Sequence, residues 1–465
     1  MPIKDDFKKH YIAVIGGSIS GSEAANILAK NGFRVVVFDM NKLPYGKIED
    51  GLPNWHVNLR NRQISEIDEK LNQTNILFVP KTKIGEDIEF LDLVTNWGFS
   101  AIILANGAWL DRLLPIPLTE KFIDKSIIYQ NSFINWFNHK HEYNYMGKNY
   151  FIKNNVLVIG GGLASLDVVK CVMIELVKKQ LFIKKGIDVD LFTFEKCGIA
   201  TVLKDNNILF KDLKIKKVKL IYRRTAKDMP LKSPKDNLIE SIEAAQIVSE
   251  KLLNKYKDAY LFDFIPLSIP ISIVERKDKL SGLILQKVAI KNGVVVPIKD
   301  NFKEIKADMI ISSIGSIPEK IHGLNYDKSS LKILNGSDCQ VFGFENVFAI
   351  GNAVTGRGNI QESKKHGSQM TELIMDKHLT EDAFEKWLNQ HNNEIKSKVT
   401  KQVNQIIKQV SSCDIQEKSI IQSIFDRTSA IHKDIGYSDY HSWIKQNTPN
   451  RLEDMSKNNV DCKCS

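Results

Sequence analysis

Two glycine-rich turns constrain the fold of this chain more than any other feature of its sequence. The first spans residues 16–21 (GGSISG) and the second spans residues 160–165 (GGGLAS). Each follows a short hydrophobic segment, residues 11–15 and 155–159, and precedes a segment with helical patterning, which for the first turn covers residues 21–31. A strand, a glycine-rich turn and a helix in this order form the phosphate-binding corner of a dinucleotide-binding unit. The sequence therefore predicts two such units in one chain.

The residues of the first turn suit a bound pyrophosphate. Gly16 permits the sharp bend after the strand, and Gly21 lets the helix pack closely against that strand. Ser18 stands where the usual pattern has a glycine beside the phosphates, and its side chain is small enough for that position. Asp39 ends the second predicted strand, where a carboxylate accepts hydrogen bonds from ribose hydroxyls. The alternative for Asp39 is an acidic turn residue without a ligand.

The second turn carries a different signal beyond its glycines. Gly160 and Gly162 fill the bend positions, and Ser165 takes the third place of the pattern. Arg223 and Arg224 end the next predicted strand, where the ribose of a bound dinucleotide is expected. Two guanidinium groups there favour a 2′-phosphate over a bare hydroxyl, and so NADP(H) over NAD(H). Arginines at a solvated strand end are the alternative, which leaves unexplained why no acidic residue stands there.

The length and composition are those of a globular chain with more than one domain. Its 465 residues, 43% hydrophobic and 26% charged, suffice for two to three domains. No stretch approaches the roughly 20 apolar residues of a membrane span, and residues 1–10 lack a signal-peptide core. The six cysteines form no C-x-x-C pair and no zinc or iron–sulfur ligand spacing. We therefore expect a cytoplasmic protein without a membrane segment, a metal site or an internal dithiol relay.

The net charge of +10 is spread unevenly along the sequence. Basic residues are densest between positions 204 and 235, where lysines far outnumber acids. Such a surface can attract an acidic protein, although lysine-rich solvated surfaces are an equally good explanation. Aromatic residues are not interleaved with the basic ones, as a base-stacking surface requires, so no nucleic-acid partner is expected.

Further motifs give the chain a family resemblance. Residues 39–46 (DMNKLPYG) have the acidic residue, spacer, proline and aromatic–glycine pair of the adrenodoxin reductase-like ferredoxin–NADP reductases, and His56 stands where that family has a histidine. Residues 105–108 (ANGA), 114–117 (LPIP) and 132–138 (SFINWFN) are similar to the same family. Residues 222–224 (YRR) with 229–230 (MP) resemble the small subunit of bacterial glutamate synthase nearly as well. The resemblance extends from residue 10 to about residue 370.

This resemblance implies two cofactors, FAD and NADP(H), and the residues that hold them. The implied FAD site comprises Gly16, Ser18, Ser20, Gly21, Asp39, Lys47, Ile84, Gly351, Asn352, Gly358, Asn359 and Ile360. The implied NADP(H) site comprises Gly160, Gly161, Gly162, Leu163, Ala164, Ser165, Arg223 and Arg224. Asn352 replaces a Trp or Asp of the family. His56 is a candidate for tuning the flavin, and a structural loop histidine is the alternative.

The implied fold is α/β, with two Rossmann-like dinucleotide-binding domains and a helical C-terminal extension. The FAD-binding domain is split around an inserted NADP-binding domain. We expect its first part at residues 1–108, the NADP-binding domain at 109–328, the second part at 329–375 and the extension at 376–465. Within the NADP-binding domain, residues 282–290 and 294–298 have the pattern of strands.

The function that this resemblance implies is an FAD-dependent NADPH oxidoreductase. It would pass electrons to a separate one-electron carrier such as a ferredoxin, and the basic stretch suggests an acidic carrier. One alternative is an NADPH-oxidising electron-input subunit of a larger complex, similar to the glutamate synthase small subunit. The cysteine segment that usually precedes the first turn in that family is absent here. A non-catalytic flavoprotein is the other alternative, because Ser18 and Asn352 depart from the pattern.

Overall fold

A five-stranded parallel sheet forms around the first glycine-rich turn. The computed structural model describes residues 10–234, 236, 238–327, 330–334, 339–355 and 381–456. The strand order is β17-β4-β1-β2-β3, and all neighbours are parallel. The strands are β1 (Tyr11–Ile15), β2 (Arg34–Phe38), β3 (Ile76–Val79), β4 (Ala101–Leu104) and β17 (Val347–Ala349). Nearly every residue of these strands is buried, as expected for a parallel sheet that is covered on both faces.

Helix α1 (Ile19–Lys30) follows the first turn and packs against this sheet. It begins two residues before the predicted start at Gly21, and Gly32 follows it with a φ of +83°. That left-handed conformation is the usual reason for a glycine just beyond a helix. The remaining helices before β4 are α2 (Lys47–Asp50), α3 (Val57–Leu71) and α4 (Phe90–Thr95).

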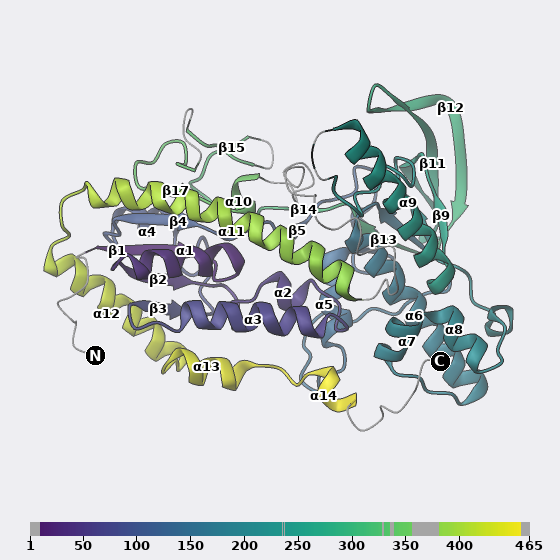
Figure 1. The fold of residues 1–465 in the computed structure, drawn as a ribbon, viewed down its shortest axis with the longest axis horizontal. Helices are drawn as coiled ribbons and strands as arrows, with labels where there is room; N and C mark the ends of the chain where they lie inside the picture. The colour runs from purple at the N-terminus through teal and green to yellow at the C-terminus, as the bar shows by residue number, and fades with distance from the viewer. Residues whose placement is uncertain are drawn as a thin grey trace.

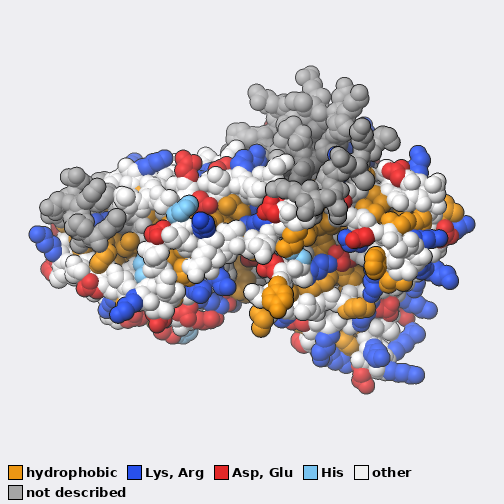
Figure 2. Space-filling model, turned by 90° about the horizontal axis from the view of Figure 1, so that it is seen from below, with side chains coloured by type: hydrophobic (Ala, Val, Ile, Leu, Met, Phe, Trp, Pro, Cys, Tyr) orange, Lys and Arg blue, Asp and Glu red, His pale blue; other side chains and the backbone are white. Residues whose placement is uncertain are grey.

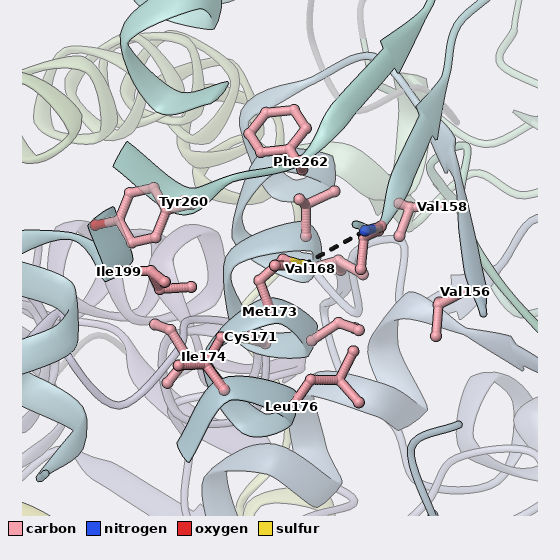
Figure 3. Packing of buried hydrophobic residues seen from close by; sticks show 14 of the residues in the cluster. Val156, Val158, Val168, Cys171, Met173, Ile174, Leu176, Ile199, Tyr260 and Phe262 are labelled. Carbon is pink, nitrogen blue, oxygen red and sulfur yellow. Dashed lines mark hydrogen bonds between the residues drawn. The ribbon is translucent and has the colours of Figure 1, made fainter. Parts of the chain in front are cut away.

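A second five-stranded parallel sheet forms around the second turn. Its order is β6-β13-β7-β8-β9, so the strand that precedes the glycine-rich turn again lies in the centre, while the edge strand next to β13 comes from before that strand in the chain. The strands are β6 (Ile127–Tyr129), β7 (Val156–Gly160), β8 (Lys219–Ile221), β9 (Asp263–Ile265) and β13 (Met309–Ser313). Helix α5 (Gln130–His139) follows β6, and α6 (Leu163–Lys185) follows β7. The core between α6 and the strands includes Met173, whose sulfur accepts the Val218 N–H at 3.4 Å (Figure 3).

The long segment between β7 and β8 is helical. Helix α6 alone accounts for 23 of its residues. Three short helices follow: α7 (Leu191–Cys197), α8 (Ile199–Asp205) and η2 (Phe210–Leu213). β8 then ends at Ile221, two residues before the predicted end at Arg223, because the chain turns there toward α9 (Ile239–Tyr260).

A three-stranded antiparallel sheet covers one side of the second parallel sheet. It consists of β10 (Ser268–Arg276), β11 (Lys279–Lys291) and β12 (Val294–Lys306), in that order. The sequence predicted strands only over residues 282–290 and 294–298. The structure extends both, because β11 and β12 form one long hairpin that protrudes at one end of the molecule (Figure 1).

Two adjacent crossovers join the sheets. β5 (Leu110–Asp111) leaves the first sheet, and β14 (Ser316–Ile317) returns to it and pairs with β5. The shorter elements near these crossovers are η1 (Glu120–Phe122), β15 (Tyr326–Asp327), β16 (Ser330–Leu331) and α10 (Asn352–Thr355). β17 pairs with β4, so the last strand of the first sheet comes after all strands of the second sheet in the chain. The predicted α/β class with one unit inserted in the other is therefore confirmed, while the residue boundaries given above stay predictions.

Four C-terminal helices wrap around the first sheet (Figure 1). They are α11 (Glu381–Ser411), α12 (Lys418–Ile435), α13 (Tyr440–Asn447) and α14 (Leu452–Ser456). Val399, Val403 and Ile406 of α11 are fully buried in the core shared by α1, β1 and β2. The predicted helical extension is thus present and belongs to the core of the first unit. Among the described residues, no helix is both long and apolar enough to cross a membrane.

Candidate dinucleotide sites

The first glycine-rich turn leaves no room for a side chain at Gly16 or Gly21. Gly16 has a φ of +98°, and a Cβ there would lie 2.8 Å from the Ala105 carbonyl oxygen. A Cβ on Gly21 would lie 1.7 Å from the Gly16 carbonyl oxygen. Helix α1 therefore approaches the end of β1 more closely than any side chain would permit. This is the contact that the sequence assigned to these two glycines.

The N-terminus of α1 has no side-chain cap within the described part of the chain. Ser18 precedes the helix, but its hydroxyl donates to the Tyr45 carbonyl at 3.0 Å instead of accepting from the helix. Backbone N–H groups of the first turn are left for an anionic ligand. At the same place, a Cβ on Gly351 would lie 2.3 Å from the Ser20 hydroxyl oxygen. Gly351 and Asn352, which follow β17, are thereby brought beside the first turn of α1.

Asp39 lies directly behind the first turn. Its two carboxylate oxygens accept hydrogen bonds from the Gly17 N–H and the Asn41 N–H, both at 2.8 Å. Burial raises the pKa of Asp39 to about 6, and the bonds from Gly17 and Asn41 oppose that rise. A carboxylate has about four acceptor positions, so it can still accept from ribose hydroxyls. The turn and Asp39 together fit a dinucleotide.

The other residues predicted for this site are placed differently. Lys47 begins α2, and its ammonium group donates to the Ser316 hydroxyl of β14 at 2.8 Å. Burial lowers the pKa of Lys47, while the negative charge of Asp111 opposes this. Ile84 is 5% exposed and packs in the core beneath the sheet, with its backbone bridged to Ile88. The predictions for Gly358, Asn359 and Ile360 lie outside the described residues.

The second turn has an open corner. A Cβ on Gly161 would lie 2.0 Å from the Tyr222 ring, so this position is filled by its neighbour. At Gly162, by contrast, no atom of the described residues lies within 4 Å of where a Cβ would be. Gly162 precedes α6, whose N-terminus also has no side-chain cap in the described structure. This space in front of an uncapped helix fits a second pyrophosphate.

The remaining residues of the second turn serve packing more than ligand contact. A Cβ on Gly160 would lie 2.2 Å from the Ser165 hydroxyl oxygen. That hydroxyl donates toward Ser313 at the end of β13, with 3.1 Å between the two hydroxyl oxygens. Leu163 is half-buried and Ala164 is exposed at the start of α6.

The two arginines after β8 have separate environments. Arg223 is exposed, whereas Arg224 is half-buried and donates to the Gly293 carbonyl at 2.8 Å. Gly293 is the turn between β11 and β12, so Arg224 ties the long hairpin to the end of β8. Asp228 orders the loop that follows, since its carboxylate accepts from the Thr225 N–H at 3.1 Å. Of the two guanidinium groups, that of Arg223 is the more accessible to a 2′-phosphate.

His56 lies at the junction of the two units. It is 3% exposed, and its Nε2 accepts the Trp55 indole N–H at 3.0 Å. The same Nε2 lies 3.7 Å from a carboxylate oxygen of Asp167 on α6. Lys170, one turn further along α6, is paired with Glu195 at 3.1 Å and lies over the Trp55 ring at 4.6 Å. A loop of the first unit and a helix of the second therefore meet through a buried polar cluster.

Asp167 and Lys170 were not predicted from the sequence. The available signal was their position among apolar residues on every side of α6, in the run 166–177 (LDVVKCVMIELV). Charged side chains are rarely fully buried unless they are paired. A helix that is apolar all round and yet contains Asp and Lys therefore indicates a buried ion-pair cluster.

The basic stretch lies at the opposite end of the second sheet from the glycine-rich turn. Lys214 and Lys216 precede β8, and their backbones bond the side chain of Asn154, which precedes β7. Residues before parallel strands gather at the amino edge of a sheet, whereas the turn follows the carboxyl end of β7. On the face drawn in Figure 2, basic side chains are spread over both ends of the molecule with acidic ones among them.

Comparisons with known proteins also find nucleotide-dependent oxidoreductases similar to this chain. Residues 10–180 match the sequence model of the pyridine nucleotide-disulphide oxidoreductases. The chain is 27% identical over 174 residues to a ferredoxin–NADP reductase of Colwellia psychrerythraea. The aligned region covers 34% of this chain and 46% of that protein. It is 30% identical over 172 residues to the glutamate synthase [NADPH] small chain of Bacillus subtilis, which covers 36% of this chain and 33% of that protein. The matched region thus spans less than half of either relative.

The solved structures include a neighbour over nearly the whole chain. FprA from Mycobacterium tuberculosis, in complex with NADPH, superposes with a TM-score of 0.63 at 18% identity. The superposition covers 91% of this chain and 90% of FprA. Both branches that the sequence resembled are thus represented among the relatives. The chain carries the pyridine nucleotide-disulphide oxidoreductase pattern over residues 10–180 and has the overall fold of FprA.

Proposed function

We propose that this chain is an FAD-dependent NADPH oxidoreductase that passes electrons to a separate one-electron carrier of the ferredoxin type. One observation carries the proposal. In the described structure, helices α1 and α6 each follow a glycine-rich turn and have no side-chain cap at the N-terminus. The buried carboxylate of Asp39 lies behind the first turn, and the adjacent Arg223 and Arg224 follow the strand after the second turn. Bound FAD supplies the ability to accept a hydride and to release electrons singly. The names of the two relatives above support the same activity.

The first site has the features that FAD requires. The uncapped turn of α1 provides N–H donors for a pyrophosphate, and Asp39 provides acceptors for ribose hydroxyls. Gly351 and Asn352 close the site from the end of β17. Lys47 and Ser316 meet beside the β5–β14 pair, where the chain crosses between the units. These residues bind and orient the cofactor.

The second site favours NADPH over NADH. Gly162 leaves open space in front of α6, and Arg223 is exposed where the second strand ends. A guanidinium group binds a phosphate with two parallel hydrogen bonds, which a bare 2′-hydroxyl cannot accept. Arg224 fixes the loop through Gly293 and so places Arg223.

At the junction, His56 lies between the two units. Its Nε2 accepts the Trp55 indole N–H at 3.0 Å and lies 3.7 Å from a carboxylate oxygen of Asp167. This position keeps His56 a candidate for tuning the flavin, and a structural loop histidine stays the alternative.

The electron acceptor is proposed by class only. A separate one-electron carrier is proposed because relatives of this chain include a ferredoxin–NADP reductase. The cytoplasm remains the predicted location.

The electron-input subunit of a larger complex remains the second candidate, favoured by the match to the glutamate synthase small chain. A partner that co-purifies at equal stoichiometry would favour that candidate.

The proposal is tested first by identifying the cofactor. The purified full chain is denatured, and the released flavin is identified by chromatography and quantified against protein. We expect one FAD per chain, either as purified or after incubation with FAD. A chain that holds no flavin under either condition contradicts the proposed function.

A further inference from the structure

The loop of residues 40–46, between β2 and α2, is built against the first glycine-rich turn. The Tyr45 carbonyl accepts the Ser18 hydroxyl at 3.0 Å. A Cβ on Gly17 would lie 2.7 Å from the Pro44 Cβ. The Asn41 N–H donates to Asp39 at 2.8 Å. The 40–46 loop thus sets the position of both the turn and the carboxylate of the first site.

The C-terminal extension holds this loop from the outside. The Trp443 indole N–H of α13 donates to the Lys42 carbonyl at 2.7 Å. The Tyr440 hydroxyl donates to Asp68 at 2.8 Å, and the Tyr45 hydroxyl donates to the same carboxylate oxygen at 3.0 Å. Asp68 therefore joins a residue of the loop to a residue of the extension.

These contacts are buried. Tyr45 is 1% exposed, Tyr440 is 7% exposed and Trp443 is 4% exposed. Burial raises the pKa of Tyr440, so its hydroxyl stays protonated and remains a donor to Asp68. A buried acceptor that loses its donor is left unsatisfied, so these hydrogen bonds favour the closed position of the loop.

The extension is itself fixed on the first unit, so it can act as a rigid support. His432 of α12 bonds the Phe78 carbonyl of β3 at 2.7 Å, and its ring stacks on Tyr437. The Phe78 ring also meets the Tyr440 ring edge-on at 5.4 Å between centroids. Further on, Arg451 pairs with Glu49 of α2. The extension therefore contacts the segment on both sides of the 40–46 loop.

We propose that the C-terminal extension, through Tyr440 and Trp443, is a positioning element that keeps the 40–46 loop closed on the first site and sets how long FAD stays bound. This inference rests on the proposed function, in which the first site holds FAD. Release of the loop displaces the Tyr45 carbonyl from Ser18 and the Asn41 N–H from Asp39. The site then loses its pre-organised form, and FAD leaves faster.

The test uses the full chain with Tyr440→Phe, which removes one hydroxyl and keeps the ring. The matched control is Tyr150→Phe, because Tyr150 is equally buried and also donates to an aspartate, Asp124, at 3.0 Å in the second unit. The FAD release rate is followed by flavin fluorescence after dilution. We expect an increase of about 3- to 10-fold for Tyr440→Phe and less than 2-fold for the control.

A second readout does not depend on flavin. Hydrogen exchange of backbone amides in residues 40–46 of the flavin-free chain is expected to rise in Tyr440→Phe and to stay unchanged in Tyr150→Phe. The inference is overturned if Tyr440→Phe leaves both the exchange and the release rate at wild-type values. It is also overturned if the two variants accelerate both equally. If the wild-type chain binds no FAD but Tyr440→Phe still raises the exchange of residues 40–46, the proposed function is contradicted. The coupling between Tyr440 and the loop is supported in that case.

Discussion

At the scale of single residues, Gly161 and Gly162 are adjacent but differ in what surrounds them. The space for a side chain at Gly161 is filled by the Tyr222 ring, whereas at Gly162 nothing in the described part of the chain, apart from its sequence neighbours, lies in that space. The first glycine is required for packing of the turn on the strand end. We propose that the second leaves room for a ligand in front of α6. Substitution by alanine separates these two roles.

We predict that Gly161→Ala destabilises the flavin-loaded protein, because the new Cβ would lie 2.0 Å from the half-buried Tyr222 ring. The expected loss is about 1–3 kcal/mol in the free energy of unfolding. Gly162→Ala is expected to change that free energy by less than about 0.5 kcal/mol and to weaken NADP⁺ binding at least tenfold. Urea unfolding and equilibrium titration measure the two effects. Normal NADP⁺ affinity in Gly162→Ala would contradict the placement of the pyrophosphate.

Arg223 carries the expected preference for the 2′-phosphate. Arg223→Ala should weaken NADPH binding by about 10- to 100-fold, the loss of one charge-assisted pair, and leave NADH binding within 2-fold. Arg276→Ala is the control, since Arg276 is an exposed arginine paired with Glu304 in the antiparallel sheet. Dissociation constants from fluorescence titration decide the matter. An equal loss for both nucleotides would show that Arg223 only holds the loop.

The sequence predicted the positions in the fold of those residues that local geometry fixes, while their roles as ligand-binding residues stay predictions. Gly16, Gly21 and Asp39 lie where the strand–turn–helix pattern put them, because chain connectivity alone brings them together. Asp167 and Lys170 could not be assigned in this way. Their partners, His56 and Glu195, come from other elements, and only the packing of the two units brings them into contact.

At the scale of elements, α2 is held between the extension and α5. Asp50 of α2 bonds His139 at the end of α5 at 3.1 Å, and Asn135 of α5 donates to the same carboxylate at 3.2 Å. Burial alone would lower the pKa of His139, but hydrogen bonds and charge from Asp50 and Glu142 raise it to about 9. The folded protein therefore binds a proton here that the unfolded chain loses near pH 6.5.

This contact predicts a pH dependence of stability. The contribution of protonated His139 is fully present below about pH 6.5 and is lost as the pH rises through about 9. We expect the loss of this proton to lower the free energy of unfolding by on the order of 1–3 kcal/mol as the pH rises from about 6.5 to about 9. His139→Gln should flatten the profile in the same window. Parallel profiles for the two proteins would show that His139 does not titrate as described.

The elements also show where sequence reasoning ends. The central strands β1 and β7 were predicted because each is a short apolar run directly before a glycine-rich turn, whereas the edge strands β6 and β9 of the second sheet were not predicted. The end of β8 was placed too late, because Tyr222 is apolar enough to continue a strand but packs on Gly161 instead. The length of β12 was underestimated, because most of that strand is exposed and its polar residues, from Lys299 onward, resemble a loop.

At the scale of the whole molecule, the two units present their glycine-rich turns at the carboxyl ends of their sheets, with the crossover strands β5 and β14 between the units. The fold class followed from the repeat of one motif. The role of the extension did not, because amphipathic helices do not show in their sequence which surface they cover. Only the structure places Val399 and Val403 in the core of the first unit.

The position of the basic stretch yields a prediction about the carrier. Lys214, Lys216 and Lys217 precede β8 and so lie at the amino edge of the second sheet, opposite the glycine-rich turn of that sheet. Changing all three to Glu should leave the rate of reduction of a [2Fe–2S] ferredoxin within about 2-fold, because charges beyond about 10 Å are screened at 0.1 M salt. A rate that falls at low salt and recovers at high salt would show instead that the carrier is attracted to this surface.

In the proposed oxidoreductase, one site holds FAD and the other delivers NADPH to it. This is tested by an anaerobic absorbance titration of the flavin-loaded chain with NADPH, and separately with NADH. We expect the flavin bands to bleach at about one NADPH per chain and to require a much higher concentration of NADH. Flavin bands that respond to neither nucleotide would contradict the oxidoreductase assignment and leave a non-catalytic flavoprotein.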